Sequence, residues 1–135
     1  MIKLLYGGRG EGMDAKLLEL AANYHAQAKG SVVFIDKDDK HIYDLASGIR
    51  LINASDYHIE GPKMFSGFLS GISAQDHDLE KIIICSFMKI VRHPVSSLEG
   101  LFDFFEEFSQ RIGADMVIGI NSDEPVPEYL KKYLA

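Results

Sequence analysis

The residues best suited to chemistry form a glycine-rich segment near the start of the chain, Gly7-Gly8-Arg9-Gly10-Glu11-Gly12-Met13-Asp14. Glycines permit backbone conformations in which successive N–H groups converge on one anion. The N-terminus of a following helix adds roughly half a positive charge. The spacing from Gly7 to Gly12 also equals that of the two glycines that open a phosphate-binding P-loop. Residues 7–14 are therefore the candidate cofactor-binding residues, with ATP, another nucleotide or phosphate as candidate ligands.

The two residues after the last glycine depart from this chemistry. A working P-loop continues with a lysine that neutralises the β and γ phosphates, and then with a serine or threonine that holds magnesium. Here the corresponding residues are Met13 and Asp14. Methionine carries no charge, and aspartate repels a triphosphate by about 1 kcal/mol or more per close pair of charges. Arg9 and Lys16 are nearby cations, but neither occupies the lysine position.

The same loop has a second interpretation, as the Gly8-x-Gly10-x-Gly12 turn of a dinucleotide or S-adenosylmethionine site in a Rossmann-like domain. In such a site an acidic residue at the end of the second strand accepts hydrogen bonds from ribose hydroxyls. Asp36 lies 24 residues after Gly12, close to the required separation. The simpler interpretation of Asp36, which we prefer, is a solvated residue at the exit of a strand.

We expect structural roles for the cysteine, the histidines and the Asp76-His77-Asp78 segment. Cys85 lies within an apolar run, so we expect a buried and inert thiol. No two histidines stand at metal-ligand spacing, and we expect all of them at the surface or at helix ends: His25, His41, His58, His77 and His93. The segment Asp76-His77-Asp78 is expected to be a solvated loop. The sequence therefore assigns no catalytic residue and no metal ligand.

The elements that position these residues alternate between two periodicities. Short apolar runs predict strands over residues 2–6, 31–35, 49–52, 81–87 and 116–120. Helical spacing predicts helices over residues 15–29, 62–72, from Ser96 or Ser97 to 108, and 128–134. Residues 42–45 fit either a short strand or an irregular turn. Alternating strands and helices predict an α/β fold, a three-layer sandwich with a mostly parallel sheet.

In a parallel α/β sheet, ligands bind at the carboxyl ends of the strands. The segments that follow the predicted strands are residues 7–14, 36–40, 53–56, 85–87 and 121–123. We therefore expect these segments to meet at one edge of the sheet and to contain the functional site.

Composition limits the class of protein. The 135 residues, 47% of them hydrophobic, predict a single domain over residues 1–135. A single cysteine excludes an intramolecular disulfide, and the apolar runs are too short for a membrane span, so we expect a cytoplasmic protein without membrane insertion. The net charge of −6 argues against nucleic-acid binding. A protein partner or a homodimer is compatible with an exposed Phe102 or Phe104, or with the helix over residues 64–72.

Several segments together resemble a known family. Leu4-Leu5-Tyr6-Gly7-Gly8-Arg9-Gly10-Glu11-Gly12, with residues 33–36, 52–55, 80–82, 87–91 and 129–133, is similar to small bacterial P-loop proteins labelled ATP-binding or twitching-motility (PilT-like) protein. The similarity extends over nearly the whole chain. It implies a P-loop NTPase-like fold.

The resemblance also locates further departures. Family members end a later hydrophobic strand with a metal-binding acid, where this chain has Cys85, and related ATPases follow it with a glutamate, where this chain has Ser86. Asn121 fits the polar residue that senses the γ phosphate. We expect a catalytically degenerate P-loop protein, a pseudoenzyme with a degenerate Walker A motif that binds or interacts without ATP hydrolysis. The alternative is residual ATP or anion binding through the loop, with Arg9 supplying charge.

Overall fold

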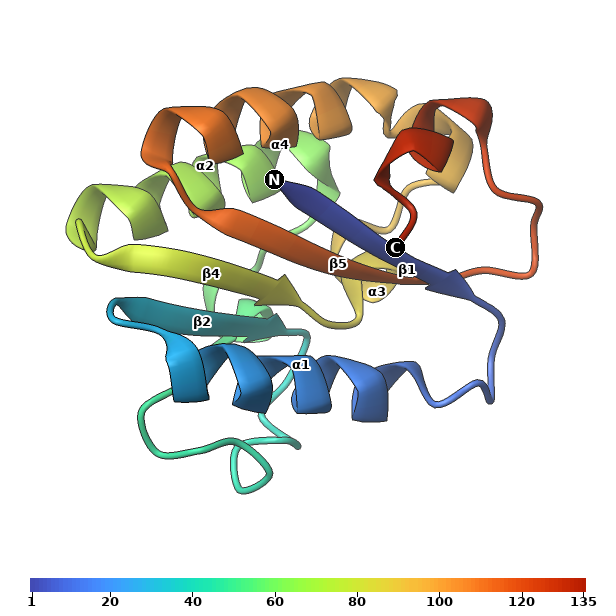
Figure 1. The fold of residues 1–135 in the computed structure, drawn as a ribbon. Helices are drawn as coiled ribbons and strands as arrows, with labels where there is room; N and C mark the ends of the chain where they lie inside the picture. The colour runs from blue at the N-terminus through green and yellow to red at the C-terminus, as the bar shows by residue number, and fades with distance from the viewer.

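A computed structural model describes all residues from Met1 to Ala135. Its centre is one parallel sheet of five strands in the order β1-β5-β4-β2-β3 (Figure 1). The strands are β1 (Ile2–Gly7), β2 (Ser31–Asp36), β3 (Arg50–Asn53), β4 (Leu79–Ile84) and β5 (Asp115–Asn121). The predicted α/β fold with a parallel sheet is thereby confirmed.

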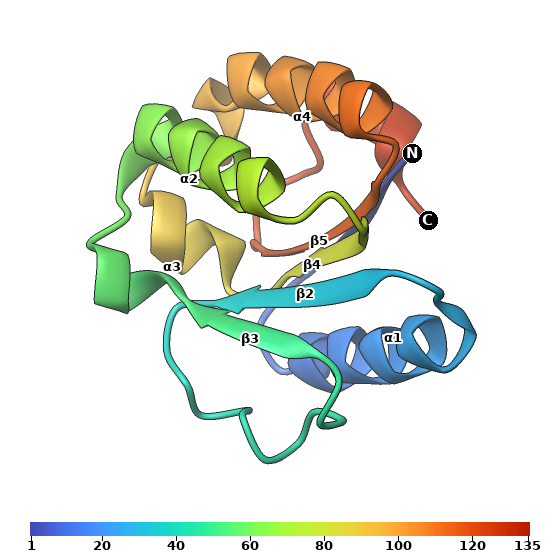
Figure 2. The ribbon, with the colours of Figure 1, turned by 90° about the vertical axis from the view of Figure 1, so that its left-hand side faces the viewer.

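Helices cover both faces of the sheet and complete three layers. The helix α1 (Met13–Gln27) lies on one face, while α2 (Gly61–Gln75), α3 (Phe87–Val91) and α4 (Glu99–Ile112) lie on the other (Figure 2). Right-handed crossovers require this division. The connection from β1 to β2 crosses the sheet in one direction, and the connections from β3 to β4 and from β4 to β5 cross it in the opposite direction.

The larger half of the core lies beneath α2, α3 and α4 and is rich in phenylalanine. Phe65, Phe87, Phe102 and Phe105 are fully buried and linked by edge-to-face pairs, with ring centroids 5.1 Å apart for Phe102 and Phe105. A smaller cluster under α1 contains nine buried residues, among them Leu17. Because β4 is apolar on both faces, it sits in the middle of the sheet between these two clusters.

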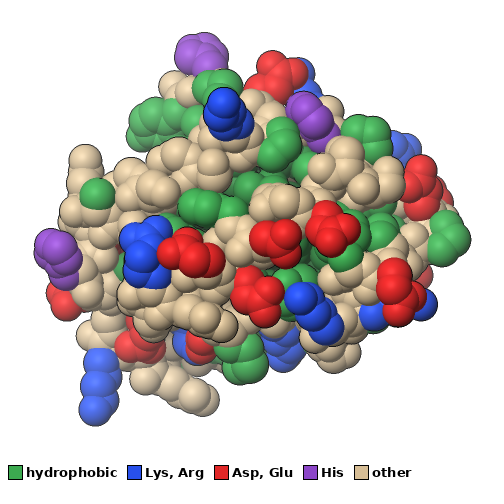
Figure 3. Space-filling model, turned by 90° about the horizontal axis from the view of Figure 1, so that it is seen from above, with side chains coloured by type: hydrophobic (Ala, Val, Ile, Leu, Met, Phe, Trp, Pro, Cys, Tyr) green, Lys and Arg blue, Asp and Glu red, His purple; other side chains and the backbone are tan.

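The outer surface of α4 is acidic. Acidic side chains gather over this helix (Figure 3), which contributes Glu99, Asp103, Glu106 and Glu107. Such a surface repels polyanions. None of the helices combines the length and the hydrophobicity needed to cross a bilayer.

Two local predictions are wrong. The strand predicted over residues 81–87 ends at Ile84, because Ser86 turns the chain with a φ of 58° and Phe87 begins the unpredicted helix α3. The serines before α4 do not cap it: residues 95–97 form a 3₁₀ turn, in which the Ser97 hydroxyl donates to the carbonyl of Pro94 at 2.7 Å. The short terminal helix predicted over residues 128–134 is present, as the 3₁₀ helix Glu128–Tyr133.

The remaining predictions hold with small shifts. Helix α1 begins two residues earlier than predicted, at Met13, and residues 42–45 form an irregular turn rather than a strand.

The aromatic side chains of α4 are less exposed than expected. Phe102 is fully buried. Phe104 is half-buried, and its ring centroid lies 5.4 Å from that of Phe108. The predicted exposed aromatic on α4 is therefore absent in the case of Phe102 and only partial in the case of Phe104.

Candidate functional site

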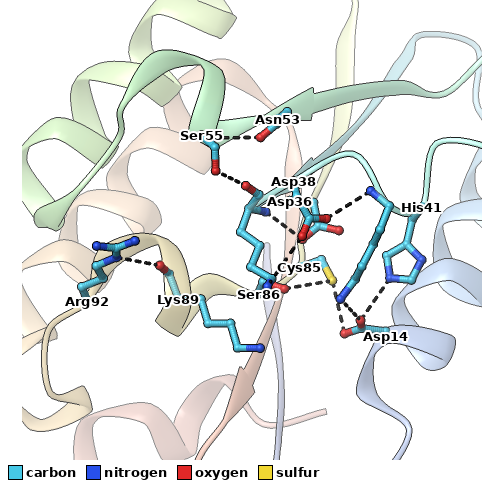
Figure 4. A network of polar contacts seen from close by, with 12 residues as sticks. Asp14, Asp36, Asp38, His41, Asn53, Ser55, Cys85, Ser86, Lys89 and Arg92 are labelled. Atoms are coloured by element: carbon cyan, nitrogen blue, oxygen red, sulfur yellow. Dashed lines mark hydrogen bonds and ion pairs between the residues drawn. The ribbon is translucent and has the colours of Figure 1, made fainter.

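The carboxyl ends of the strands meet at one edge of the sheet, as predicted. There the chain leaves β2 through residues 37–49 on the side of α1, whereas it leaves β4 into α3 on the opposite face (Figure 2). Adjacent strands whose connections diverge in this way leave a crevice between them, which is the usual ligand position in open α/β sheets. Side chains from this crevice are drawn in Figure 4.

The glycine loop closes around one of its own side chains. The backbone N–H of Gly8 donates to Oε2 of Glu11 at 3.0 Å. A Cβ at Gly7 would collide with the same carboxylate oxygen, so a side chain at this position would displace Glu11. Gly10 and Gly12 have φ angles of 81° and 72°, in the left-handed region that favours glycine. The loop therefore has an anion-binding turn, and a carboxylate of the chain itself occupies part of it.

Met13, at the lysine position of a P-loop, does not face the loop. Its side chain is buried, and its Sδ would lie 3.1 Å from a Cβ built on Gly119 in β5. The side chain thus fills the space between α1 and the sheet. Lys16 is exposed on α1.

Arg9 and Asn121 border the outside of the loop. Both line an open hollow of about 260 Å³ with Gly10, Gly12 and Asp14, and both also line a smaller neighbouring hollow of about 140 Å³. Arg9 is exposed and is the only cation lining the first hollow. The hollows are the space in which an anion could approach the loop from solvent.

Asp14, in the first turn of α1, is the centre of a polar cluster (Figure 4). Its Oδ2 lies 3.0 Å from Nε2 of His41 and 3.4 Å from Nζ of Lys40. Its Oδ1 lies 3.4 Å from Sγ of Cys85. The other ring nitrogen of His41, Nδ1, lies 2.9 Å from Oδ2 of Asp44. Residues from α1, the 37–49 loop and the end of β4 therefore converge on one point.

The charges in this cluster favour the ionised forms of Asp14 and His41. Partial burial raises the pKa of Asp14, but hydrogen bonds from His41 and Cys85 and the charge of Lys40 outweigh it, and the net pKa lies below its usual value. Burial lowers the pKa of His41, but its hydrogen bonds to Asp44 and Asp14 outweigh that effect and raise the pKa overall. The position of His41 between two carboxylates therefore favours its protonated form.

Asp36, at the end of β2, is completely buried, so the expectation of a solvated residue is wrong. Its Oδ1 accepts a hydrogen bond from the backbone N–H of Lys37 at 2.7 Å, and its Oδ2 has no partner. Burial raises the pKa of this carboxyl group and outweighs the backbone N–H of Lys37 and the nearby hydroxyl of Ser86, which lower it. The backbone N–H of Cys85 donates to the carbonyl of Ile35 at 2.8 Å, which holds Asp36 and Cys85 on neighbouring strand ends.

Cys85 is fully buried, as predicted. Burial is the main cause that raises the pKa of its thiol well above the usual range, and the charges of Asp36 and Asp14 add to it. The thiol is therefore protonated and inert as a nucleophile in the structure as it stands.

A larger basic hollow lies beside the crevice. Its volume is about 550 Å³, and its charged lining residues are Lys37, Asp38, Lys89 and Arg92. Two of its cations already have partners, since Lys37 Nζ lies 3.6 Å from Oδ2 of Asp38 and Arg92 Nη1 lies 3.8 Å from Oε1 of Glu60.

The structure brings together some predicted site residues and adds others. Asp14 and Cys85, singled out in the sequence for what they replace, are in contact. His41, expected at the surface, is instead largely covered, with 15% of its side chain exposed. No protein-family model and no curated protein matches the chain.

Proposed function

We propose that the chain is a catalytically degenerate P-loop-like protein that does not hydrolyse ATP and acts by binding. The observation that carries the proposal is the hydrogen bond from the Gly8 N–H to the Glu11 carboxylate inside the glycine loop. A loop of this shape binds anions through backbone N–H groups. In this chain one of those groups already donates to an internal carboxylate.

The charges around the loop support the same conclusion. A triphosphate approaching residues 7–14 would meet the carboxylates of Glu11 and Asp14, while Arg9 is the one cation that lines the hollow. Met13 supplies no charge and is packed under α1. Charge neutralisation normally contributes several kcal/mol to phosphoryl transfer, and these residues cannot provide it.

The contact between Asp14 and Cys85 is a third support. The resemblance to P-loop proteins implies that these two positions would hold magnesium, through a hydroxyl and a strand-end acid. In this chain they are a carboxylate and a protonated thiol, 3.4 Å apart. Magnesium prefers oxygen ligands, so replacing the acid by a thiol weakens such a site.

A direct test measures phosphate release from ATP with magnesium, using the purified chain and its Gly12→Val variant as a matched control. We expect both proteins to match the rate of the enzyme-free reaction. Magnesium-dependent hydrolysis by the natural chain that disappears in Gly12→Val would refute the proposal.

Residual anion or nucleotide binding is the second candidate. It is favoured by the hollow that Arg9 and Asn121 line beside the loop. Calorimetry measures the binding of phosphate, ATP, ADP and S-adenosylmethionine without relying on catalysis. It tests this second candidate and also the Rossmann-like alternative. A response to S-adenosylmethionine alone would favour that alternative, and no response to any of the four would exclude both.

The binding role includes a protein partner or a second copy of the chain as candidates. Met64 on α2 is 48% exposed, and Tyr57, whose ring lies 5.9 Å from that of Phe68 on the same helix, is 59% exposed. Light scattering on the natural chain and on Met64→Glu tests the homodimer. A monomer in both cases would leave a different protein as the partner to be sought.

A further inference from the structure

Three side chains in the crevice offer three different metal-binding atoms. One carboxylate oxygen of Asp14, one ring nitrogen of His41 and the sulfur of Cys85 all lie within 4.8 Å of one another. Zinc bonds of about 2.0–2.3 Å in a tetrahedron separate the donor atoms by roughly 3.3–3.7 Å. The distance of 3.4 Å from Asp14 Oδ1 to Cys85 Sγ already lies in that range. Figure 4 shows the three side chains directed toward one point.

The second nitrogen of His41 has the partner that a metal-binding histidine requires. Nδ1 lies 2.9 Å from Oδ2 of Asp44, so this nitrogen can keep its proton and donate it to the carboxylate. Nε2 is then the nitrogen that faces Asp14. Such a carboxylate–histidine pair fixes both the tautomer and the orientation of a metal ligand.

Asp36 provides an independent sign of an absent cation. Its carboxylate is completely buried beside Cys85, and its Oδ2 has no hydrogen-bond partner. It lies near the cluster, because the backbone N–H of Cys85 donates to the carbonyl of Ile35, and its charge adds to the raised pKa values of Cys85 and His41. A buried, unpaired carboxylate oxygen is strongly unfavourable unless a donor or a cation reaches it.

We propose that Asp14, His41 and Cys85 form a Zn²⁺ site, and that the nearby buried carboxylate of Asp36 supplies further negative charge to it. One thiolate, one imidazole and carboxylate oxygen favour zinc over magnesium or calcium, which prefer oxygen alone. The site is independent of the proposed function, since it requires neither nucleotide binding nor the glycine loop.

Zinc would replace the positive charges that the cluster now uses. In the metal-free chain Nζ of Lys40 lies 3.4 Å and Nε2 of His41 lies 3.0 Å from Oδ2 of Asp14, so these two groups are its cationic partners. Binding releases the thiol proton of Cys85 and the Nε2 proton of His41 to solvent, and Lys40 moves aside. The ion enters past Asp14 and His41, whose side chains are 34% and 15% exposed, because Cys85 is covered.

The test measures zinc content and affinity for the full chain, without nucleotide, by elemental analysis after dialysis and by calorimetry. We expect one zinc per chain, and at least tenfold weaker binding in Cys85→Ser and in His41→Gln. Asp44→Asn should weaken binding by about tenfold, the usual effect of removing the partner of a ligand histidine. The matched control is His77→Gln, in the exposed Asp76-His77-Asp78 turn, which should bind zinc like the natural chain.

Absorption by bound Co²⁺ distinguishes a metal ligand from a residue that has only a structural role. A thiolate–Co²⁺ bond gives an intense near-ultraviolet band, and Cys85 is the only cysteine in the chain. We expect this band in the natural chain and in His77→Gln, but not in Cys85→Ser. Circular dichroism of the metal-free variants checks that each one is folded. Absence of stoichiometric zinc in the natural chain, or equal losses in His77→Gln and His41→Gln, would overturn the proposal.

Discussion

The thiol of Cys85 lies 3.4 Å from Oδ1 of Asp14, which joins the end of β4 to the first turn of α1 across 71 positions of sequence. The contact lies below the surface, because Cys85 is fully buried and Asp14 is partly covered by His41 and Lys40. The thiol is therefore shielded twice, by burial and by the adjacent negative charge.

This contact predicts a cysteine that reacts slowly. With metal removed by EDTA, we expect Cys85 to react with Ellman's reagent at pH 8 at least about a hundredfold more slowly than in urea, since burial raises its pKa and blocks access. Absorbance at the wavelength of the released thiolate follows both reactions. Asp14→Asn is the informative variant, because it removes the neighbouring charge and should speed the reaction while the chain stays folded. Equal rates in native and urea-unfolded protein would contradict the buried thiol.

Replacing the buried carboxylate of Asp36 should stabilise the chain by an amount that depends on pH. The folded chain raises the pKa of this carboxyl group above 3.8, so its contribution to stability is fully present below that pH and is lost as pH rises through the folded value. Asp36→Asn removes the buried charge and should stabilise the metal-free chain by about 1–3 kcal/mol at pH 8, and by less at pH 4. Urea denaturation at the two pH values measures the difference.

The neighbouring Asp38 supplies the control for this experiment. It is 39% exposed and pairs with Lys37, so Asp38→Asn should change stability by less than about 1 kcal/mol at either pH. A loss of stability in Asp36→Asn at pH 8 under metal-free conditions would mean that a hydrogen-bond donor of the folded chain already satisfies the carboxylate of Asp36.

Most elements could be predicted from the sequence because they depend on local patterns. The run Val32-Val33-Phe34-Ile35 and the run at residues 116–120 are β-branched and continuous, as buried parallel strands are, and both form central strands. Because all the strands run parallel, the carboxyl end of each is the one that contributes to the site. The order of the strands could not be predicted, because it depends on which crossovers bury the largest apolar faces.

The site was only half predictable for a different reason. Asp36 is followed by the charged segment Lys37-Asp38-Asp39-Lys40, which locally is typical of a solvated turn, yet the fold covers it with the end of β4 and the 37–49 loop. His41 has no histidine or cysteine at ligand spacing. Its partners come from α1 and β4, so only the three-dimensional fold brings them within reach.

Glu11 predicts how anion binding to the loop can be restored. Glu11→Ala frees the Gly8 N–H and removes one negative charge from the loop, so phosphate should bind about fivefold more tightly, or about 1 kcal/mol. Calorimetry with phosphate at low salt measures the change. Glu19→Ala, on the exposed face of α1, removes the same charge at a distance and should have a smaller effect. Equal effects of the two variants would show that net charge, not loop occupancy, limits binding.

His41 predicts a second pH dependence of the free energy of unfolding. The pKa of His41 is raised by hydrogen bonds to carboxylates, whereas that of Asp36 is raised by burial. The pKa of His41 is raised above 6.5, since its hydrogen bonds to Asp44 and Asp14 outweigh its burial. The stability that it contributes is fully present below about pH 6.5 and is lost as pH rises through the folded value. In EDTA, His41→Gln should therefore lower the free energy of unfolding by about 1 kcal/mol near pH 6 and by less near pH 9. His77→Gln, at an exposed position, serves as the control. A loss that is the same at both pH values would contradict a raised pKa of His41.

The close approach of α1 to β5 gives the last prediction. A Cβ at Gly119 would lie 2.7 Å from Cδ1 of Leu17 and 3.1 Å from Sδ of Met13, so Gly119→Ala should destabilise the chain by about 1–3 kcal/mol. Gly67, in the middle of α2, has nothing within 4 Å of an added Cβ, so Gly67→Ala should instead stabilise by about 0.5–1 kcal/mol. Urea denaturation of the two variants compares them directly. Because α1 carries Asp14 at its start, Gly119→Ala should also weaken zinc binding, whereas Gly67→Ala should leave it unchanged. A neutral Gly119→Ala would show that α1 has room to move away from the sheet, and that Asp14 is not held against Cys85 by the packing of this helix.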